Sequence, residues 1–202
     1  MKQLNTYINE KLVIGKNIIH KKIRVSTKTE LRKILEERLN EDQNADLNDL
    51  DVSQITNMSG LFGGLNMYNI KIDKWDVSNV TNMNSMFEGC THFNSDLSKW
   101  DVSNVENMGC MFVYCINFNS DLSQWDVSKV KNMENMFYDC LNFNSNLNKW
   151  DVSKVISMVN MFSKCKKFNS DLSNWDISNV KGMDDMFNGC QSLKNKPSWY
   201  KN

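Results

Sequence analysis

The chain has 202 residues, with 24 basic and 24 acidic side chains and a formal net charge of zero. This length suits one domain with an apolar core or one short repeat array. Because neither sign of charge dominates, the composition favours neither nucleic acid nor an anionic membrane as a partner. The local basic cluster at His20, Lys21, Lys22 and Arg24 is typical of a solvated segment.

The first 25 residues are interpreted as a separate N-terminal segment. The run MKQLNTYINEKLVIGKN is polar over its first eleven residues and has neither the apolar core nor the small-residue cleavage site of a secretory signal. No run of about 18 apolar residues occurs, so we expect no membrane insertion. The sequence therefore predicts a cytoplasmic or virion location, with the cell surface reached only by another export route.

The start of this segment, MKQLNTYINE, resembles the N-terminal targeting peptides of tailed-phage proteins that are packaged into heads. In those proteins a prohead protease cuts after an Ile-x-Glu or Leu-x-Glu triplet. The resemblance implies cleavage after Glu10, the last residue of the triplet Ile8-Asn9-Glu10. The alternative is a short helix or strand that packs on the following segment.

Residues 26–46 are predicted to form a helical N-terminal cap. Residues 27–30 read T-K-T-E, the spacing of a capping box, which predicts a helix from about residue 28 to residue 40. Its apolar face consists of Leu31, Ile34, Leu35 and Leu39. We expect this helix to cover the open end of the first repeat.

Residues 47–195 contain six copies of a 25-residue repeat. Tryptophan, for example, recurs at Trp75, Trp100, Trp125, Trp150 and Trp175. The first copy is degenerate and has Leu50 in the tryptophan position. A partial last copy places Leu193 in the Phe168 register and Tyr200 in the Trp175 register, so residues 196–202 are predicted to be a C-terminal cap.

Two patterns occur within each repeat. Leu97-x-x-Trp100-x-Val102 has leucine-rich-repeat spacing, and its alternation from Trp100 to Val102 predicts a short strand. From Val105 to Cys115, apolar residues recur at steps of three and four, which predicts a short helix with Ser103 as its N-cap. Stacked copies then form an α/β repeat solenoid: a leucine-rich-repeat-like right-handed coil with a parallel sheet on one face and short helices on the other.

The unit FNSDLSKWDVSNVENMGCMFVYC resembles the repeat of the BspA-like leucine-rich-repeat surface proteins, including the mycoplasma-lipoprotein type. The shared motif is W-D-V-S-x-V, then M-x-x-M-F-x-x-C, then F-N, over about residues 47–195. The resemblance implies a protein-binding or adhesive role without enzymatic activity. Many family members carry a signal peptide, a lipobox or an anchoring tail, and none of these is recognised in this sequence.

One aspartate follows the tryptophan position of each repeat, and together these form a column: Asp51, Asp76, Asp101, Asp126, Asp151 and Asp176. Stacked like charges oppose one another, so the column needs compensation. A structural interpretation is an Asx turn to the backbone ahead, plus cross-strand pairing with lysines such as Lys99. A functional alternative is a recognition strip for a basic partner, formed by Asp76, Lys99, Asp101, Ser103, Asp126, Asp151 and Asp176. A row of divalent cations is a third interpretation.

The remaining columns favour structure over chemistry. Five cysteines recur 25 residues apart and are predicted to form a buried, reduced ladder, and the asparagine column at Asn94 and its equivalents is predicted to brace turns. His20 and His92 recur in no register, and no catalytic motif is present. We therefore predict a non-catalytic protein-interaction scaffold without metal or cofactor, associated with a phage or virion. An exported cell-surface adhesin is the alternative.

Overall fold

The computed structural model describes residues 11–14, 17–20 and 22–201. Within these ranges the elements are β1 (Lys11–Ile14), β2 (Asn17–His20), β3 (Ile23–Arg24), α1 (Lys28–Glu41) and β4 (Leu50–Asp51). Strands β1 and β2 pair antiparallel, whereas β3 pairs parallel with β4. The proposed cleavage site after Glu10 lies outside the described residues.

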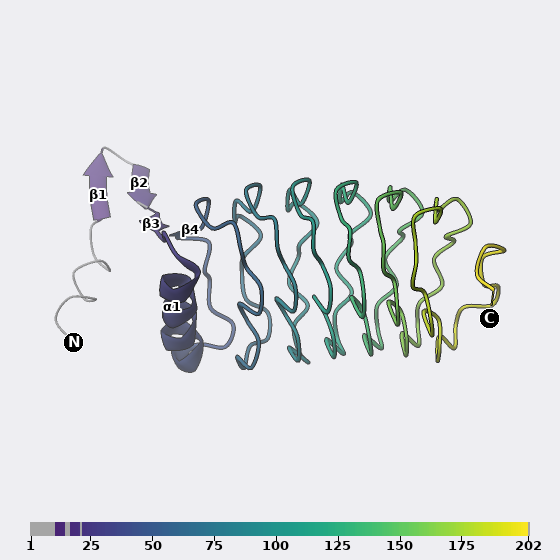
Figure 1. The fold of residues 1–202 in the computed structure, drawn as a ribbon. Coiled ribbons are helices and arrows are strands. Elements are labelled where there is room, and N and C mark those ends of the chain that lie inside the picture. The colour runs from purple at the N-terminus through teal and green to yellow at the C-terminus, as the bar shows by residue number, and fades with distance from the viewer. Residues whose placement is uncertain (1–10, 15–16, 21, 202) are drawn as a thin grey trace.

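Beyond α1 the chain runs in successive 25-residue coils that lie side by side along one axis (Figure 1). We number them from one to six by their residues: 44–68, 69–93, 94–118, 119–143, 144–168 and 169–193. Equivalent positions in neighbouring coils are therefore 25 residues apart in the sequence. The apolar core is the shared interior of these coils and continues from α1 to Phe187.

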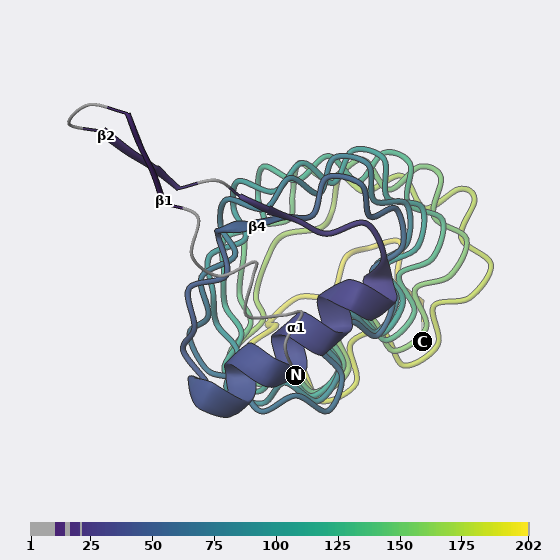
Figure 2. The same cartoon turned by 90° about the vertical axis from the view of Figure 1, so that its left-hand side faces the viewer.

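Helix α1 lies across the N-terminal end of the stack (Figure 2). Its N-cap is Thr27, whose hydroxyl accepts the Glu30 N–H at 3.1 Å, while Glu30 Oε2 accepts the Ser26 N–H at 3.0 Å. Three leucines of its apolar face are buried against the first coil: Leu31, Leu35 and Leu39. The helix ends at Glu41, one residue beyond the predicted end, and covers apolar surface that the first coil would otherwise expose.

The interior consists of columns of identical side chains. Successive tryptophans stack almost parallel, with ring centroids 6.4 Å apart for Trp75 and Trp100 and 6.5 Å apart for Trp125 and Trp150. The indole Nε1 of Trp125 donates to the Leu97 carbonyl oxygen at 3.0 Å, and the other tryptophans make the equivalent bond. The tryptophan column that the 25-residue period predicts is therefore present.

The segment predicted as a strand has a different local structure. The Trp100 N–H donates to the Leu97 carbonyl at 3.1 Å, and the Val105 N–H donates to the Val102 carbonyl at 2.9 Å. Both are turns within a coil, so these N–H groups do not pair with a neighbouring coil. Single-residue parallel bridges join the coils further along, as between Asn82 and Asn107. Polar side chains that bind the local backbone compete here with a strand ladder.

The segment predicted as a helix is a series of turns. Alternate N–H groups leave the coil for the next one: Met108 donates to the Asn132 carbonyl at 3.0 Å, and Phe112 donates to the Met136 carbonyl at 2.9 Å. Positive φ angles, such as 57° at Cys110, interrupt any helical run. The apolar residues that recur at steps of three and four therefore face the interior from turns, and hydrogen bonds join these turns from coil to coil.

At the C-terminal end, the residue whose backbone matches the tryptophan register is not the residue whose ring lies in the tryptophan column. The Tyr200 N–H donates to the Pro197 carbonyl as Trp175 does to Leu172, which matches the predicted register of Tyr200. The ring in the tryptophan column is nevertheless that of Trp199, stacked at 6.5 Å on Trp175. Its Nε1 donates to the Leu172 carbonyl at 3.0 Å. The preceding residue has thus taken the interior place that the sequence assigned to Tyr200.

Candidate functional site

Each aspartate of the predicted column makes an Asx turn. Asp101 Oδ1 accepts the backbone N–H of Ser103 at 3.0 Å. The same bond joins Asp51, Asp76, Asp126, Asp151 and Asp176 to the serines two residues ahead. The structural interpretation of the column is therefore confirmed in this respect. Ser103 belongs to this turn and, because no helix begins there, does not act as an N-cap.

The turns also keep several of these carboxylates ionised. Hydrogen bonds from the Ser103 side chain and backbone hold the pKa of Asp101 below its ordinary value, and Ser153 does the same for the pKa of Asp151. The column is exposed at Asp76, Asp101, Asp126, Asp151 and Asp176. It therefore presents negative charge to solvent at fixed positions along the stack.

Lys99 does not provide the predicted compensation for Asp101. The ion pairs of the described residues include none with Lys74, Lys99 or Lys149, so the predicted cross-strand pairing is not found there. The pKa of Asp96 is lowered chiefly by hydrogen bonds from Ser98, and the positive charge of Lys99 lowers it further. The reason is local, because the turn from Leu97 to Trp100 replaces the alternating strand that the pairing required.

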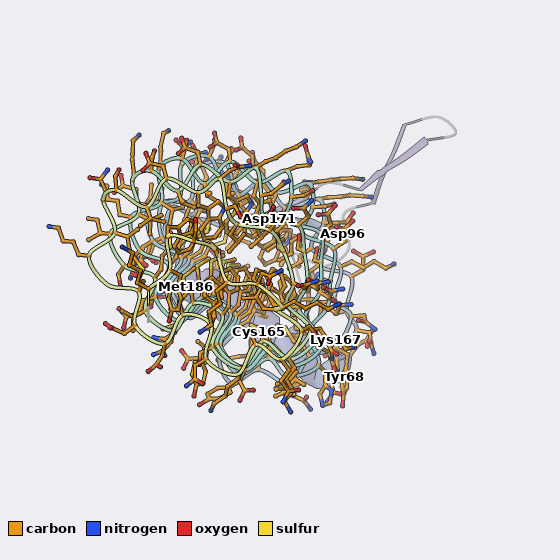
Figure 3. The ribbon with its side chains drawn as sticks, turned by 90° about the vertical axis from the view of Figure 1, so that its right-hand side faces the viewer. Tyr68, Asp96, Cys165, Lys167, Asp171 and Met186 are labelled. Carbon is orange, nitrogen blue, oxygen red and sulfur yellow. The ribbon has the colours of Figure 1, made fainter. Side chains whose placement is uncertain are left out.

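A second carboxylate column lies five residues before the first, and the sequence reasoning missed it. Asp96 Oδ1 accepts the Ser98 N–H at 2.9 Å, and Asp121 and Asp171 make the same turn. The signal was present in the sequence, because D-L-S precedes D-V-S in two of the repeats and D-I-S in a third. Figure 3 shows Asp96 and Asp171 on the same side of the stack.

We name the segment that contains both columns the acidic stretch: residues 46–51, 71–76, 96–101, 121–126, 146–151 and 171–176. It contains twelve aspartates and four lysines, although the whole chain has no net charge. The charge is therefore distributed unevenly: the stretch is negative when summed over the six coils, although residues 71–76 and 146–151 each hold equal numbers of aspartates and lysines. An array of this kind attracts a cationic partner through its summed field.

The asparagine column braces neighbouring coils, as the sequence predicts. Asn94 Oδ1 accepts the backbone N–H of Asn119 at 2.7 Å, and Asn119 Oδ1 accepts that of Asn144 at 2.8 Å. Asn144 repeats the contact with Asn169 at 2.8 Å. Each side chain accepts a backbone N–H of the next coil, so the repetition of these asparagines has a structural explanation.

The cysteine column is also interior. The Cys140 Sγ lies 2.9 Å from the Phe112 carbonyl oxygen, and burial raises the pKa of the Cys140 thiol well above its ordinary value. Burial raises the pKa of Cys90 to about 12. The six cysteines are free thiols. Within the described ranges, no three His, Cys, Asp or Glu side chains converge as a metal site would require.

No helix in the part of the chain that the structure describes is long and apolar enough to cross a bilayer.

Together the stack and its columns define a class: a repeat protein with a recurring apolar interior and an acidic stretch on its surface. The family described as "Mycoplasma protein of unknown function, DUF285" matches residues 29–140 and 117–201. The chain belongs to this family. No curated protein and no solved structure matches the chain.

Proposed function

We propose that this chain is a non-catalytic protein–protein interaction scaffold, a right-handed solenoid of the BspA-like leucine-rich-repeat type, which binds a basic segment of its partner through the acidic stretch. The observation that carries this proposal is the excess of twelve aspartates over four lysines in the acidic stretch, summed over the six coils. The resemblance of the repeat to the BspA-like surface proteins supports it.

The geometry of the carboxylates suits binding. Because Asp101 and its equivalents are held by Ser N–H groups, little side-chain freedom remains to be lost when a cation docks. Parallel bridges elsewhere in the coils hold neighbouring coils about one ladder spacing, roughly 5 Å, apart, so successive carboxylates follow one another at about that spacing. A partner with several lysines or arginines would meet several fixed negative charges at once, which raises avidity.

Repetition also argues against catalysis as the role of these residues. The Asp–Ser pair recurs in every coil with the same bond, whereas an active site needs one asymmetric arrangement of different groups. A row of equal sites suits contact along a length of partner chain.

A matched pair of triple variants tests the proposal. Asp101→Asn, Asp126→Asn and Asp151→Asn together remove three charges but retain an Oδ1 acceptor for each turn. We expect an unchanged circular dichroism spectrum and at least tenfold weaker binding of a fluorescent lysine-rich peptide. The alanine triple should lose the turns as well. If the asparagine triple binds the peptide as the wild type does, the acidic stretch is not the recognition surface.

An exported adhesin is the second candidate, favoured by the resemblance to surface proteins. Protease treatment of intact cells, followed by fractionation, separates it from a scaffold inside the cell or in a virion. Mass spectrometry of the native protein tests the phage association, because cleavage after Glu10 would give a mature chain that starts at Lys11.

A further inference from the structure

A second, partly exposed segment of the coils differs from the acidic stretch, because its residues vary from one coil to the next. It lies between the two buried phenylalanines of coils two to five, and we name it the variable corner: residues 88–92, 113–117, 138–142 and 163–167. Its sequences are EGCTH, VYCIN, YDCLN and SKCKK, and the shared residue is the interior cysteine. The stacking of coils does not require one residue type at the positions that differ. The surface chemistry therefore changes from coil to coil along the stack.

The corner displays side chains where the backbone favours glycine. The residue directly before the interior cysteine has a positive φ in each of these coils. It is Gly89 in the second coil, with φ of 76°, and Tyr114, Asp139 and Lys164 in the next three, with φ of 60°, 60° and 64°. Side chains other than glycine are disfavoured in this left-handed region. A Cβ built at Gly89 meets nothing within 4 Å, whereas one built at the equivalent Gly189 lies 3.3 Å from the Lys164 Cα of the neighbouring coil. Tyr114 and Lys164 are exposed and Asp139 is half-buried, so these residues lie at the surface and not in the apolar core.

Aromatic and cationic groups form a continuous row along the corner. Tyr114 is 45% exposed and meets Tyr138 edge to face, with ring centroids 5.7 Å apart and planes at 89°. Lys164 Nζ lies 4.7 Å from the centroid of the Tyr138 ring. Half-buried Ile116 and Leu141 flank this row. Three neighbouring coils thus contribute to one row of rings that ends in a charge.

The end of the row at the fifth coil is basic. Lys166 and Lys167 are exposed beside Lys164, and no ion pair of the described residues includes any of the three. The nearest carboxylate on the corner is Asp139 of the fourth coil, and Glu88 lies in the second. Figure 3 shows Lys167 at a different corner of the stack from Asp171. The corner is therefore polarised, with apolar rings in the third and fourth coils and positive charge in the fifth.

We propose that the variable corner is a second docking surface, for an extended acidic peptide segment of a protein partner. Apolar side chains of that segment pack on Tyr114 and Tyr138, and its carboxylates pair with Lys164 and the two lysines beside it. The inference rests on the proposed scaffold function and adds a second surface with the opposite charge preference.

The dimensions fit such a segment. The distance from the third coil to the fifth is about 10 Å for two ladder spacings, which an extended peptide covers in about three residues. Single-stranded nucleic acid also stacks on tyrosines, but its backbone charge is uniform along its length. Here the positive charge is confined to one end, beside Asp139, which favours a ligand whose apolar and anionic parts are separate.

Fluorescence anisotropy on the full chain tests the proposal. The probe is a labelled peptide of two leucines followed by three glutamates, and its comparison probes carry lysines in place of the glutamates or are a short oligothymidylate. We expect the acidic peptide to bind at least tenfold tighter than both at the variable corner. Tighter oligothymidylate binding that competes with the peptide would assign the corner to nucleic acid and overturn the proposal.

Two matched triple variants locate the binding. Lys164→Ala, Lys166→Ala and Lys167→Ala remove three charges from the corner. The control triple, Lys74→Ala, Lys99→Ala and Lys149→Ala, removes the same charge from the acidic stretch. We expect a loss of at least tenfold for the first and less than twofold for the second. Equal losses would show attraction by net charge alone and reject the docking surface.

Methyl NMR provides a readout that does not depend on a variant. On titration with the acidic peptide, the signals of Ile116 and Leu141 should shift, while Ile156, an equally apolar side chain that is 44% exposed in another column, should not. If the lysine-rich peptide binds the acidic stretch but the acidic peptide leaves Ile116 unmoved, only this inference fails. If neither peptide binds, the scaffold function fails with it.

Discussion

The acidic stretch and the variable corner are parts of the same coils, yet they differ in what fixes their residues. In the acidic stretch each exposed aspartate also holds a turn, as Asp101 holds Ser103, so its repetition follows from structure. In the corner only the buried cysteine repeats, and residues such as Tyr114 adopt a backbone conformation that suits glycine better. Structure therefore accounts for the residues of one surface and leaves those of the other free to carry a specific contact.

A substitution in the apolar interior, which supports both surfaces, should have the largest effect on the free energy of unfolding. Trp125→Ala should lower the free energy of unfolding by about 3–5 kcal/mol, because it opens a cavity in the core. It also removes the indole donor to the Leu97 carbonyl, which then keeps only the Trp100 N–H. Urea denaturation followed by fluorescence of the remaining tryptophans measures this loss. Trp199→Ala, at the half-buried end of the same column, should cost less, and an equal cost would contradict a stack that is tightest at its centre.

The sequence predicted this interior well and the backbone around it poorly. The period of 25 residues places Trp100 and its equivalents in one column whatever the path between them. Whether a given N–H bonds inside its coil or to the next coil depends on local competition, which periodicity does not reveal. Trp100 donates to Leu97 in a turn, and Met108 donates to the next coil where a helix was predicted. The column of Asp101 was found because it repeats, and the row from Tyr114 to Lys164 was missed because it does not.

Acid should weaken the acidic stretch through several turns at once. The pKa values of seven aspartates are held low in the folded chain, chiefly by serine hydrogen bonds: Asp51, Asp96, Asp101, Asp121, Asp151, Asp171 and Asp176. A depressed pKa contributes stability above the unfolded value of 3.8, and that contribution is lost as pH falls through the folded values. Urea denaturation at pH 7 and at pH 3 should therefore show a lower free energy of unfolding in acid.

Salt separates this mechanism from general charge repulsion. Below pH 4 the chain becomes positive, and its self-repulsion is screened by about 0.5 M salt, at which the Debye length is only a few ångströms. Loss of the Asp–Ser bonds is local and persists in salt. Full recovery of stability at pH 3 on adding salt would show that the turns do not cause the acid sensitivity.

A single turn should contribute less. Asp101→Ala removes the Oδ1 acceptor of the Ser103 N–H and, by analogy with loss of a helix N-cap, should cost about 0.5–2 kcal/mol. Asp101→Asn keeps the acceptor and should cost less. Chemical denaturation of the two variants side by side measures the difference. If asparagine costs as much as alanine, the charge of Asp101 and not its turn stabilises the coil.

The smallest expected effect on stability falls at the variable corner, where a structural role and a recognition role make opposite predictions. Tyr114→Gly relieves a left-handed backbone strain of about 1–2 kcal/mol. It also loses the edge-to-face contact with Tyr138, about 0.5–1.5 kcal/mol, and frees the unfolded chain by about 0.5–1 kcal/mol. These effects offset one another, so the free energy of unfolding should change by less than about 1 kcal/mol while the acidic peptide binds several-fold more weakly.

The reverse change in the second coil isolates the strain. Gly89→Tyr introduces the left-handed penalty where an added Cβ meets no atom within 4 Å, so it should destabilise the chain by about 1 kcal/mol. If Tyr114→Gly instead costs more than about 2 kcal/mol, the tyrosine supports the coil as Trp125 does. The contrast between a surface explained by stacking and one left free for binding would then disappear, because both would be parts of the same scaffold.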